Sequence, residues 1–393
     1  MNTHKVSIKT IILAICALVM SSCSIVRGLR TDGKYGPNIF SFEKRNVDTI
    51  ANGETAFIYP LGKSADWIDT MHFYNKPHQC NYTTFGEAFN AESSTQGILI
   101  IHNDSVIYER YWGDFSPDCI ATVFSVSKSI TSLLCGIAVD DGYIRSIDDP
   151  ITDYLPELKK KDPMWQKLTI RHLLDMKSGL DFDDTYEFRW KELKYLNAMA
   201  KLNYGHDIMK QIRGLKFRCE PGTKRRYESM TAAILGVVIE RASGKRYADY
   251  LSEKVWTPLG MEHTALVNID SRKHDVAHSF GGISTTVRDL AKIGSLYLNN
   301  GMWNGKRIVS EDWIRQTITF DESTVGYHFN WYNINYEGFD RIQYSGYYAL
   351  GICEQVLYVN PYKNLVMVRI GLNNNGCTII PVLFEQLSGS WQE

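Results

Sequence analysis

Apolar residues form strand-like runs near both ends of the chain. Each pair of runs is separated by a turn signal, such as Asn103-Asp104, and this pattern predicts a β-hairpin. Strands from the two ends of a chain can join one antiparallel sheet, with the intervening residues forming a second lobe. The runs occupy residues 97–101, 106–111, 354–359 and 364–370.

Between these hairpins, apolar residues recur at helical spacing. The clearest case follows Ser125, where Ile130, Leu133, Leu134 and Ile137 share one face and Gly142 stands where a helix would end. The fold class expected is α/β (α+β), an antiparallel sheet flanked by helices. A sheet lobe of about 46–124 and 280–393 would carry a mostly helical lobe of about 125–279. Further helices are expected at 169–179 (ending at Gly179), about 185–213, 231–243, 289–299 and near 378–388.

The first residues have the features of a targeting segment. Lys5 and Lys9 precede an apolar run at 11–20 that is too short to span a bilayer. The following Met20-Ser21-Ser22-Cys23 resembles a bacterial lipobox, which implies cleavage before Cys23 and lipid attachment there. A plain secretory signal with Cys23 left free is the alternative. The expected mature protein is an exported, membrane-anchored lipoprotein with a tether at 23–45.

Composition excludes few functions but narrows the partners. The chain has 393 residues, 44% of them hydrophobic, and a formal net charge of −1, so neither nucleic acid nor an acidic polymer is expected as a partner. Six of the eight cysteines lie beyond Cys23 and could form disulfides in an exported protein, but their pairing cannot be deduced. Cys135 falls within the apolar helix and is expected to be a core residue.

Ser125 and Lys128 are the candidate nucleophile and base. Three-residue spacing on a helix puts both side chains on one face, and a lysine with a lowered pKa can take the proton of a serine hydroxyl. A lone Ser-x-x-Lys match is also read as a helix cap followed by a solvated lysine. The strongly apolar helix that follows makes a solvated lysine less natural there.

Tyr227 is the candidate third member of the site. It precedes the helix predicted at 231–243, and a neighbouring lysine ammonium is expected to lower its pKa, so that it could act as a second acid or base. A structural tyrosine with a hydrogen-bonded hydroxyl is the alternative.

These residues resemble the serine β-lactamase and penicillin-binding-protein superfamily, on its class C side, from about Gly97 to Ile370. The resemblance implies a β-lactamase/transpeptidase-like fold with Ser125, Lys128 and Tyr227 as catalytic residues. The matching stretches are Ser125-Val126-Ser127-Lys128, Tyr227-Glu228-Ser229, 173–180 and 281–291.

The third motif of that superfamily departs from its usual form. Where a Lys-Thr-Gly or His-Thr-Gly is usual, this chain has Ala349-Leu350-Gly351, so the cation that helps to hold a substrate carboxylate is missing. Gly351 keeps a close backbone approach possible. The same alignment implies an oxyanion hole from the backbone N–H groups of Ser125 and Ile352, beside Gly351.

The stretch from Tyr348 to Gln355 is most similar to the 6-aminohexanoate-dimer hydrolase and carboxylesterase branch. This resemblance implies that Tyr186, Ser229 and Ala349 lie where substrate binds. The expected function is hydrolysis of a small or peptide-like ester or amide through an acyl-enzyme, with no metal or cofactor. The alternatives are a β-lactamase or D-Ala-D-Ala carboxypeptidase, and a non-enzymatic binding or sensing lipoprotein.

Overall fold

The computed structural model describes residues 24–33, 36–73, 82–90, 94–184, 198–320, 326–333, 346–372 and 380–391. The leader, Cys23 and Tyr186 lie outside these ranges, so their predicted roles remain predictions. Within the described ranges, none of the helices combines the length and the apolar character that crossing a membrane requires.

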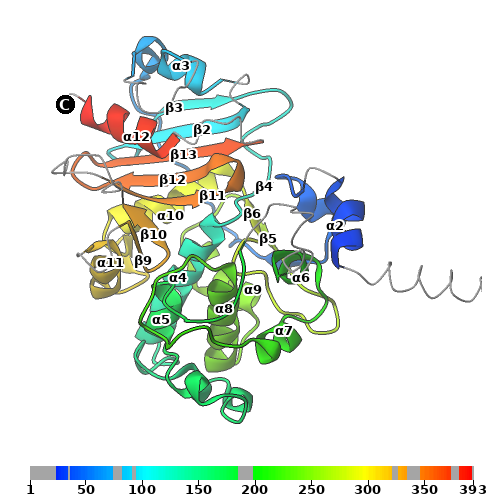
Figure 1. The fold of residues 1–393 in the computed structure, drawn as a ribbon. Coiled ribbons are helices and arrows are strands. Elements are labelled where there is room, and N and C mark those ends of the chain that lie inside the picture. Colours follow the sequence, from blue (N-terminus) through cyan, green and yellow to red (C-terminus); the bar gives the residue numbers. More distant parts are fainter. Residues whose placement is uncertain are drawn as a thin grey trace, which may run out of the picture.

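A seven-stranded antiparallel sheet joins strands from both ends of the chain, as the hairpin patterns predict (Figure 1). Its order is β3-β2-β13-β12-β11-β10-β9. At the turn between β2 and β3, Asn103 and Asp104 both have positive φ (48° and 57°), which these two residue types tolerate well. The strands are β2 (Thr95–His102), β3 (Ser105–Tyr111), β9 (Tyr327–His328), β10 (Trp331–Asn333), β11 (Tyr347–Gly351), β12 (Gln355–Asn360) and β13 (Leu365–Gly371).

Both faces of this sheet are covered. Alternate residues of β2 enter two different cores: Leu99 and Ile101 face one, while Ile98 and Ile100 face the other. Helices α3 (Phe85–Ala88) and α12 (Ile380–Gly389) cover the second core. Helices α4 (Val126–Asp140) and α10 (Val287–Leu298) cover the first. A strand buried on both faces reads as a continuous apolar run, which is the pattern of 97–101.

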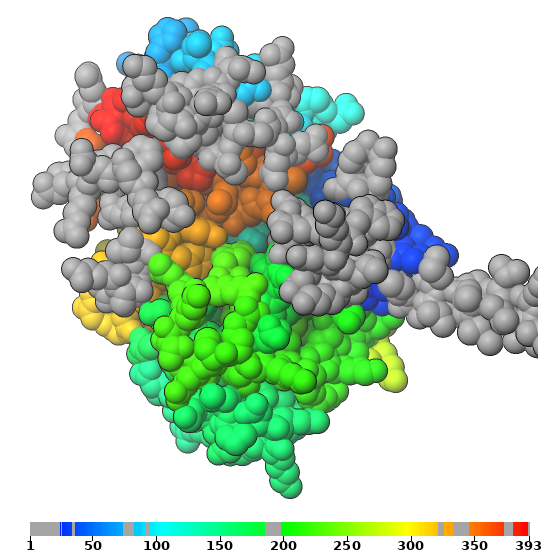
Figure 2. All heavy atoms as spheres, in the orientation of Figure 1, coloured from blue at the N-terminus to red at the C-terminus, as the bar shows by residue number. Residues whose placement is uncertain are grey.

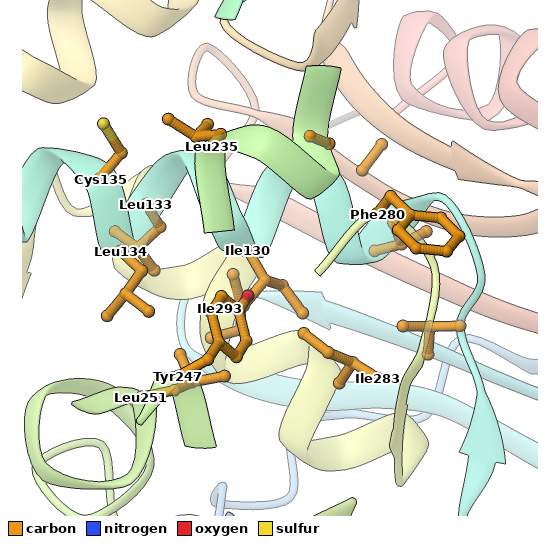
Figure 3. Packing of buried hydrophobic residues seen from close by; sticks show 14 of the residues in the cluster. Ile130, Leu133, Leu134, Cys135, Leu235, Tyr247, Leu251, Phe280, Ile283 and Ile293 are labelled. Carbon is orange, nitrogen blue, oxygen red and sulfur yellow. The ribbon is translucent and has the colours of Figure 1, made fainter. Parts of the chain in front are cut away.

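Helix α4 is the centre of the helical part. Every residue from Val126 to Ala138 is buried. Figure 3 shows its apolar side chains meeting residues of α8, α9 and α10. A Cβ at Gly136 would lie 2.4 Å from the Trp313 ring of α11, so glycine is required there. The remaining helices are α5 (Ile170–Leu174), α6 (Ala198–Tyr204), α7 (Ile208–Gly214), α8 (Ser229–Ser243), α9 (Tyr247–Leu251) and α11 (Glu311–Ile318).

A second, four-stranded sheet has the order β1-β5-β6-β4. Strand β4 leads within three residues into Ser125 at the start of α4. The sequence-based boundary between the lobes passes through this sheet, because β5 falls in the stretch assigned to the helical lobe. Its strands are β1 (Val47–Ile50), β4 (Ala121–Thr122), β5 (Ala265–Asn268) and β6 (Ile283–Thr285); β7 (Met302–Trp303) and β8 (Lys306–Arg307) form a separate hairpin.

The prediction of an N-terminal tether is wrong for residues 24–33 and 36–45. Helix α2 (Ser24–Asp32) packs beside α6, where Arg27 Nε donates to the Tyr204 carbonyl at 2.7 Å (Figure 1). Ile39 is fully buried, and the short 3-10 helix η2 (Ser41–Lys44) follows it. The sequence of this stretch has little apolar pattern. Its packing could not be predicted from that pattern, because ion pairs and hydrogen bonds hold much of it in place.

Some helix ends differ from the prediction. Helix α5 ends at Leu174, because Met176 already has a positive φ of 56°. Gly179 instead lies against the Cys219 carbonyl, 2.4 Å from where a Cβ would stand. The helix predicted at about 185–213 consists, within the described residues, of α6 and α7. Other short helical turns are η3 (Asp66–Thr70), η5 (Ile151–Asp153), η6 (Pro156–Leu158), η7 (Pro163–Gln166), the π turn η9 (Ser252–Trp256) and η10 (Ile352–Glu354).

Candidate active site

Ser125 stands at the junction between strand β4 and helix α4. It is half-buried and immediately precedes the helix. The residue before it, Phe124, has a φ of 46°, a conformation that costs a non-glycine residue roughly 1 kcal/mol or more. This tight turn places the Ser125 side chain at the N-terminal end of α4, where the helix dipole favours developing negative charge.

Lys128 lies one turn along the helix, with Nζ 2.8 Å from Ser125 Oγ. Nζ also donates to the Phe280 carbonyl at 2.6 Å, and the residue is only 1% exposed. Burial lowers the pKa of Lys128 to about 8, with the charge of Asp184 opposing that change. An amine with this pKa is partly neutral near pH 8 and can then accept the proton of a hydroxyl.

A second buried lysine shows what a structural lysine looks like in the same protein. Lys292 of α10 is fully buried and forms ion pairs of 3.2 Å with both Asp289 and Glu262. Lys128 has no such ion pair within the described part of the chain. A buried lysine without a paired carboxylate is costly, and such groups cluster at functional sites.

Tyr227 also reaches Ser125. The side chains of Ser125 and Tyr332 are close enough to the Tyr227 hydroxyl to lower its pKa, and Lys128 Nζ lies 5.1 Å from the centre of its ring. The expectation that Lys128 lowers the pKa of Tyr227 is wrong, because burial raises that pKa and the charge of Asp184 raises it further. The raised pKa favours the protonated Tyr227 hydroxyl, which can donate a hydrogen bond or a proton.

The end of strand β11 closes against the start of α4. A Cβ at Gly351 would stand 2.5 Å from the Val123 carbonyl oxygen and 3.2 Å from the Ser125 backbone nitrogen, so only glycine allows this approach. Ile352, the next residue, lines the same pocket as Ser125. The backbone of these two residues therefore borders one space.

That pocket encloses about 420 Å³ of non-protein space, part of it open to solvent. Several of its walls come from segments far apart in the sequence, including η2, the Phe280 loop and β5. Its lining residues are Pro37, Ser41, Arg45, Thr122, Phe124, Ser125, Asn203, Asn268, Phe280, Gly281 and Ile352.

The predictions for Ser229 and Ala349 as substrate contacts need correction. Ala349 is fully buried in the core beneath the site. Ser229 is also fully buried, and both its N–H (3.0 Å) and its hydroxyl (3.2 Å) donate to Asp184. Ala349 faces inward because side chains alternate along β11, and Ser229 begins helix α8 with Asp184 as its partner. Tyr186 lies outside the described residues.

Asp184 and the aromatic residues beside Tyr227 are the parts of the site that the sequence did not single out. Asp184 places a half-buried carboxyl, its pKa raised by loss of solvent, within electrostatic reach of Lys128. Tyr227 packs edge-on against Tyr327, which in turn packs against Tyr332. Asp184 lies two residues before Tyr186, which the resemblance singles out, and this was its only signal in the sequence. Tyr327 and Tyr332 carried none.

One group of side chains among the described residues could hold a metal ion: Asp207, Asp270 and His274. The Asp270 carboxylate already accepts hydrogen bonds from backbone N–H groups of Ile208, Ser271 and Val276. None of these three acidic or imidazole groups lines the Ser125 pocket.

Known proteins are similar to this chain in sequence and in fold. A 6-aminohexanoate-dimer hydrolase of Paenarthrobacter ureafaciens is 28% identical over 298 residues, 71% of this chain and 73% of that protein. The structure titled "Putative 6-aminohexanoate-dimer hydrolase from Bacillus anthracis" has a TM-score of 0.73 at 19% identity and covers 91% of both chains. A class C beta-lactamase structure from Rhodobacter sphaeroides has a TM-score of 0.57 at 18% identity, covering 77% of this chain and 97% of the other.

At these identities the two structural matches show the fold alone. The sequence also matches the family described as Beta-lactamase over residues 87–370, well over half of the chain. That range contains Ser125, Lys128, Tyr227 and Gly351, and it excludes α2 and η2. The chain therefore belongs to the beta-lactamase family of hydrolases.

Proposed function

We propose that this protein is a serine hydrolase that cleaves an ester or amide through an acyl-enzyme on Ser125. The observation that carries the proposal is the buried amine of Lys128, 2.8 Å from Ser125 Oγ, with a pKa lowered to about 8. A serine hydroxyl is a weak nucleophile unless a base beside it takes its proton.

In the first half-reaction, Ser125 Oγ attacks the substrate carbonyl carbon while its proton passes to neutral Lys128. The tetrahedral intermediate collapses by breaking the bond to the alcohol or amine, which leaves with a proton delivered from Lys128 through Tyr227. In the second half-reaction, water attacks the carbonyl carbon of the Ser125 ester and gives one proton to Lys128. The bond from that carbon to Ser125 Oγ breaks, the proton passes from Lys128 to Oγ, and the acid product leaves. The sum is one bond hydrolysed and the enzyme restored.

The negative charge that develops on the carbonyl oxygen needs donors placed before the reaction begins. The N–H groups of Ser125 and Ile352 are proposed for this role, because both residues border the pocket and Gly351 lets their backbones meet. Removing one such donor in other hydrolases costs about a hundred- to a thousandfold in rate.

Among the substrates that members of the superfamily cleave, a linear amide or ester is better supported for this protein than a β-lactam. The similarity to a 6-aminohexanoate-dimer hydrolase supports a linear amide or ester. A β-lactam or D-Ala-D-Ala substrate is less well supported, because Ala349 replaces the cation of the third motif and is buried. A purely binding protein is less well supported too, because it would not need an unpaired buried lysine beside a serine.

The test compares turnover by wild type, Ser125→Ala and Ser132→Ala on 4-nitrophenyl esters, a linear 6-aminohexanoate dimer and a fluorescent penicillin. Ser132 lies on the same helix, is buried, and its hydroxyl has no hydrogen-bond partner among the described residues, so its loss should be silent. We expect ester or amide hydrolysis by wild type and Ser132→Ala but not by Ser125→Ala. Equal turnover by wild type and Ser125→Ala would refute the proposal, and labelling by penicillin without ester or amide turnover would favour the alternative.

A further inference from the structure

The pocket beside Ser125 contains a cation that the family match does not include. Arg45 is the only charged side chain among the described residues that line this pocket. It follows η2, within the N-terminal segment that packs on the helical part and lies outside the matched range 87–370. In Figure 2 the described N-terminal residues, in blue, lie at the edge of the molecule between the green helices and the orange and cyan strands.

Contacts hold the Arg45 side chain in place, but one of its N–H donors has no hydrogen-bond partner among the described residues. Its side chain is only 10% exposed, and its Nη2 donates to Asp32 Oδ2 at 2.5 Å. The guanidinium carbon lies 4.8 Å from the centre of the Tyr204 ring. Its Nε–H is buried without a hydrogen-bond partner among the described residues. Burying such a donor unpaired costs about 1–3 kcal/mol, and an acceptor on an occupant of the pocket that Arg45 lines would remove that cost if it reached this N–H.

The other polar groups of the pocket suit the same occupant. The amides of Asn203 and Asn268 line it, and Asn268 is 3% exposed. No acidic residue is among the described lining residues, and the carboxylate that balances Arg45 belongs to Asp32, which is not one of them. The parallel N–H groups of a guanidinium match the two oxygens of a carboxylate. Neighbouring amides can donate further hydrogen bonds, and no acid in the described lining would repel the anion.

We propose that Arg45 binds a carboxylate of the substrate, so that the enzyme prefers esters or amides that carry an anionic group. This inference rests on the function proposed above. It also explains how the site can lack a cation at Ala349: a positive charge enters the Ser125 pocket from a different segment. Arg45 would then determine specificity without taking part in the proton transfers.

The experiment measures kcat/KM for mono-4-nitrophenyl adipate, which is anionic, and for 4-nitrophenyl heptanoate, which is neutral and of similar length. A charge-assisted hydrogen bond predicts that Arg45→Gln lowers the anionic-to-neutral ratio about ten- to a hundredfold, mainly through KM for the adipate ester. Arg45→Lys should restore part of the ratio. An unchanged ratio in Arg45→Gln would overturn the inference while leaving the proposed function intact.

Two control variants separate anion binding from a merely structural role. Asp32→Asn weakens the same contact with Arg45 and removes the compensating charge, so anion binding predicts that the anionic-to-neutral ratio rises. Arg27→Ala removes a bond between α2 and Tyr204 outside the pocket lining and should leave the ratio unchanged. If Arg45→Gln, Asp32→Asn and Arg27→Ala all lower turnover of both esters equally, Arg45 only holds the segment in place.

A binding measurement keeps the inference testable without turnover. Calorimetric titration of adipate into the Ser125→Ala protein should show binding that Arg45→Gln weakens at least about tenfold, and 1,6-hexanediol should bind neither. Adipate binding that is absent, or identical with and without Arg45, would overturn the inference. Failure of Ser125→Ala to abolish ester turnover would instead refute the proposed function.

Discussion

The start of helix α4 and the N-terminal segment that carries Arg45 border one pocket but differ in how their sequence encodes them. The α4 start has its serine and lysine three residues apart in an apolar helix, so local spacing alone places them together. The N-terminal segment contributes one arginine whose position depends on Asp32 and on Tyr204 of α6. The Ser125–Lys128 pair is thus encoded locally, whereas the position of Arg45, and with it the proposed selectivity, depends on tertiary contacts.

The largest effect is expected from removing the base at the α4 start. Lys128→Met keeps a long buried side chain but no amine, and should lower ester hydrolysis about a hundred- to ten-thousandfold, as general-base losses do. Lys292→Met should mainly lower stability, because it breaks the ion pairs with Asp289 and Glu262. Kinetics and thermal unfolding of both variants measure this, and a fully active Lys128→Met would show that another group is the base.

The N-terminal segment is expected to behave as part of the folded body. Ile39→Ala should lower the free energy of unfolding by about 2–5 kcal/mol, because Ile39 is fully buried. Leu29→Ala is the matched control, since Leu29 is 55% exposed and its loss should cost less than about 0.5 kcal/mol. Urea unfolding measures both values. If neither substitution changed stability, the segment would be a loose tether after all.

A substitution at Gly351 tests the close approach between β11 and α4. Gly351→Ala should cost about 1–3 kcal/mol of stability and reduce ester turnover, because its Cβ would collide with the Val123 carbonyl. Gly214→Ala is the control, as nothing lies within 4 Å of its Cβ position. Urea unfolding and ester hydrolysis rates of the two variants measure the loss of stability and of turnover. An active, stable Gly351→Ala would mean that the approach is not required.

The smallest expected effect is the change in the rate of ester hydrolysis with pH. Lys128 acts as a base only when neutral, and its pKa is lowered to about 8. The neutral fraction therefore grows with pH, so kcat/KM for the neutral heptanoate ester should rise about tenfold between pH 7 and pH 9. The rise should be absent in Lys128→Met. A profile that is flat, or that falls over this range, would contradict a lysine base.

Patterns within the sequence predicted most of the framework. The two hairpins, α4, α8 and α10 follow from apolar periodicity, and the motif matches brought Ser125, Lys128 and Tyr227 into one site. The rest depends on what packs around each residue. Spacing could not show that burial raises the pKa of Tyr227, nor that Ala349 faces the core. The position of Arg45 could not be predicted from the sequence either, because it depends on contacts with Asp32 and Tyr204.

Trapping the acyl-enzyme tests the central claim most directly. The purified protein is treated with a fluorophosphonate, or with a 4-nitrophenyl ester followed by an acid quench, and its mass and modified peptide are determined. The account predicts a single adduct on the peptide that contains Ser125, absent from Ser125→Ala and present in Ser132→Ala. An adduct on another residue, or equal labelling of wild type and Ser125→Ala, would contradict it.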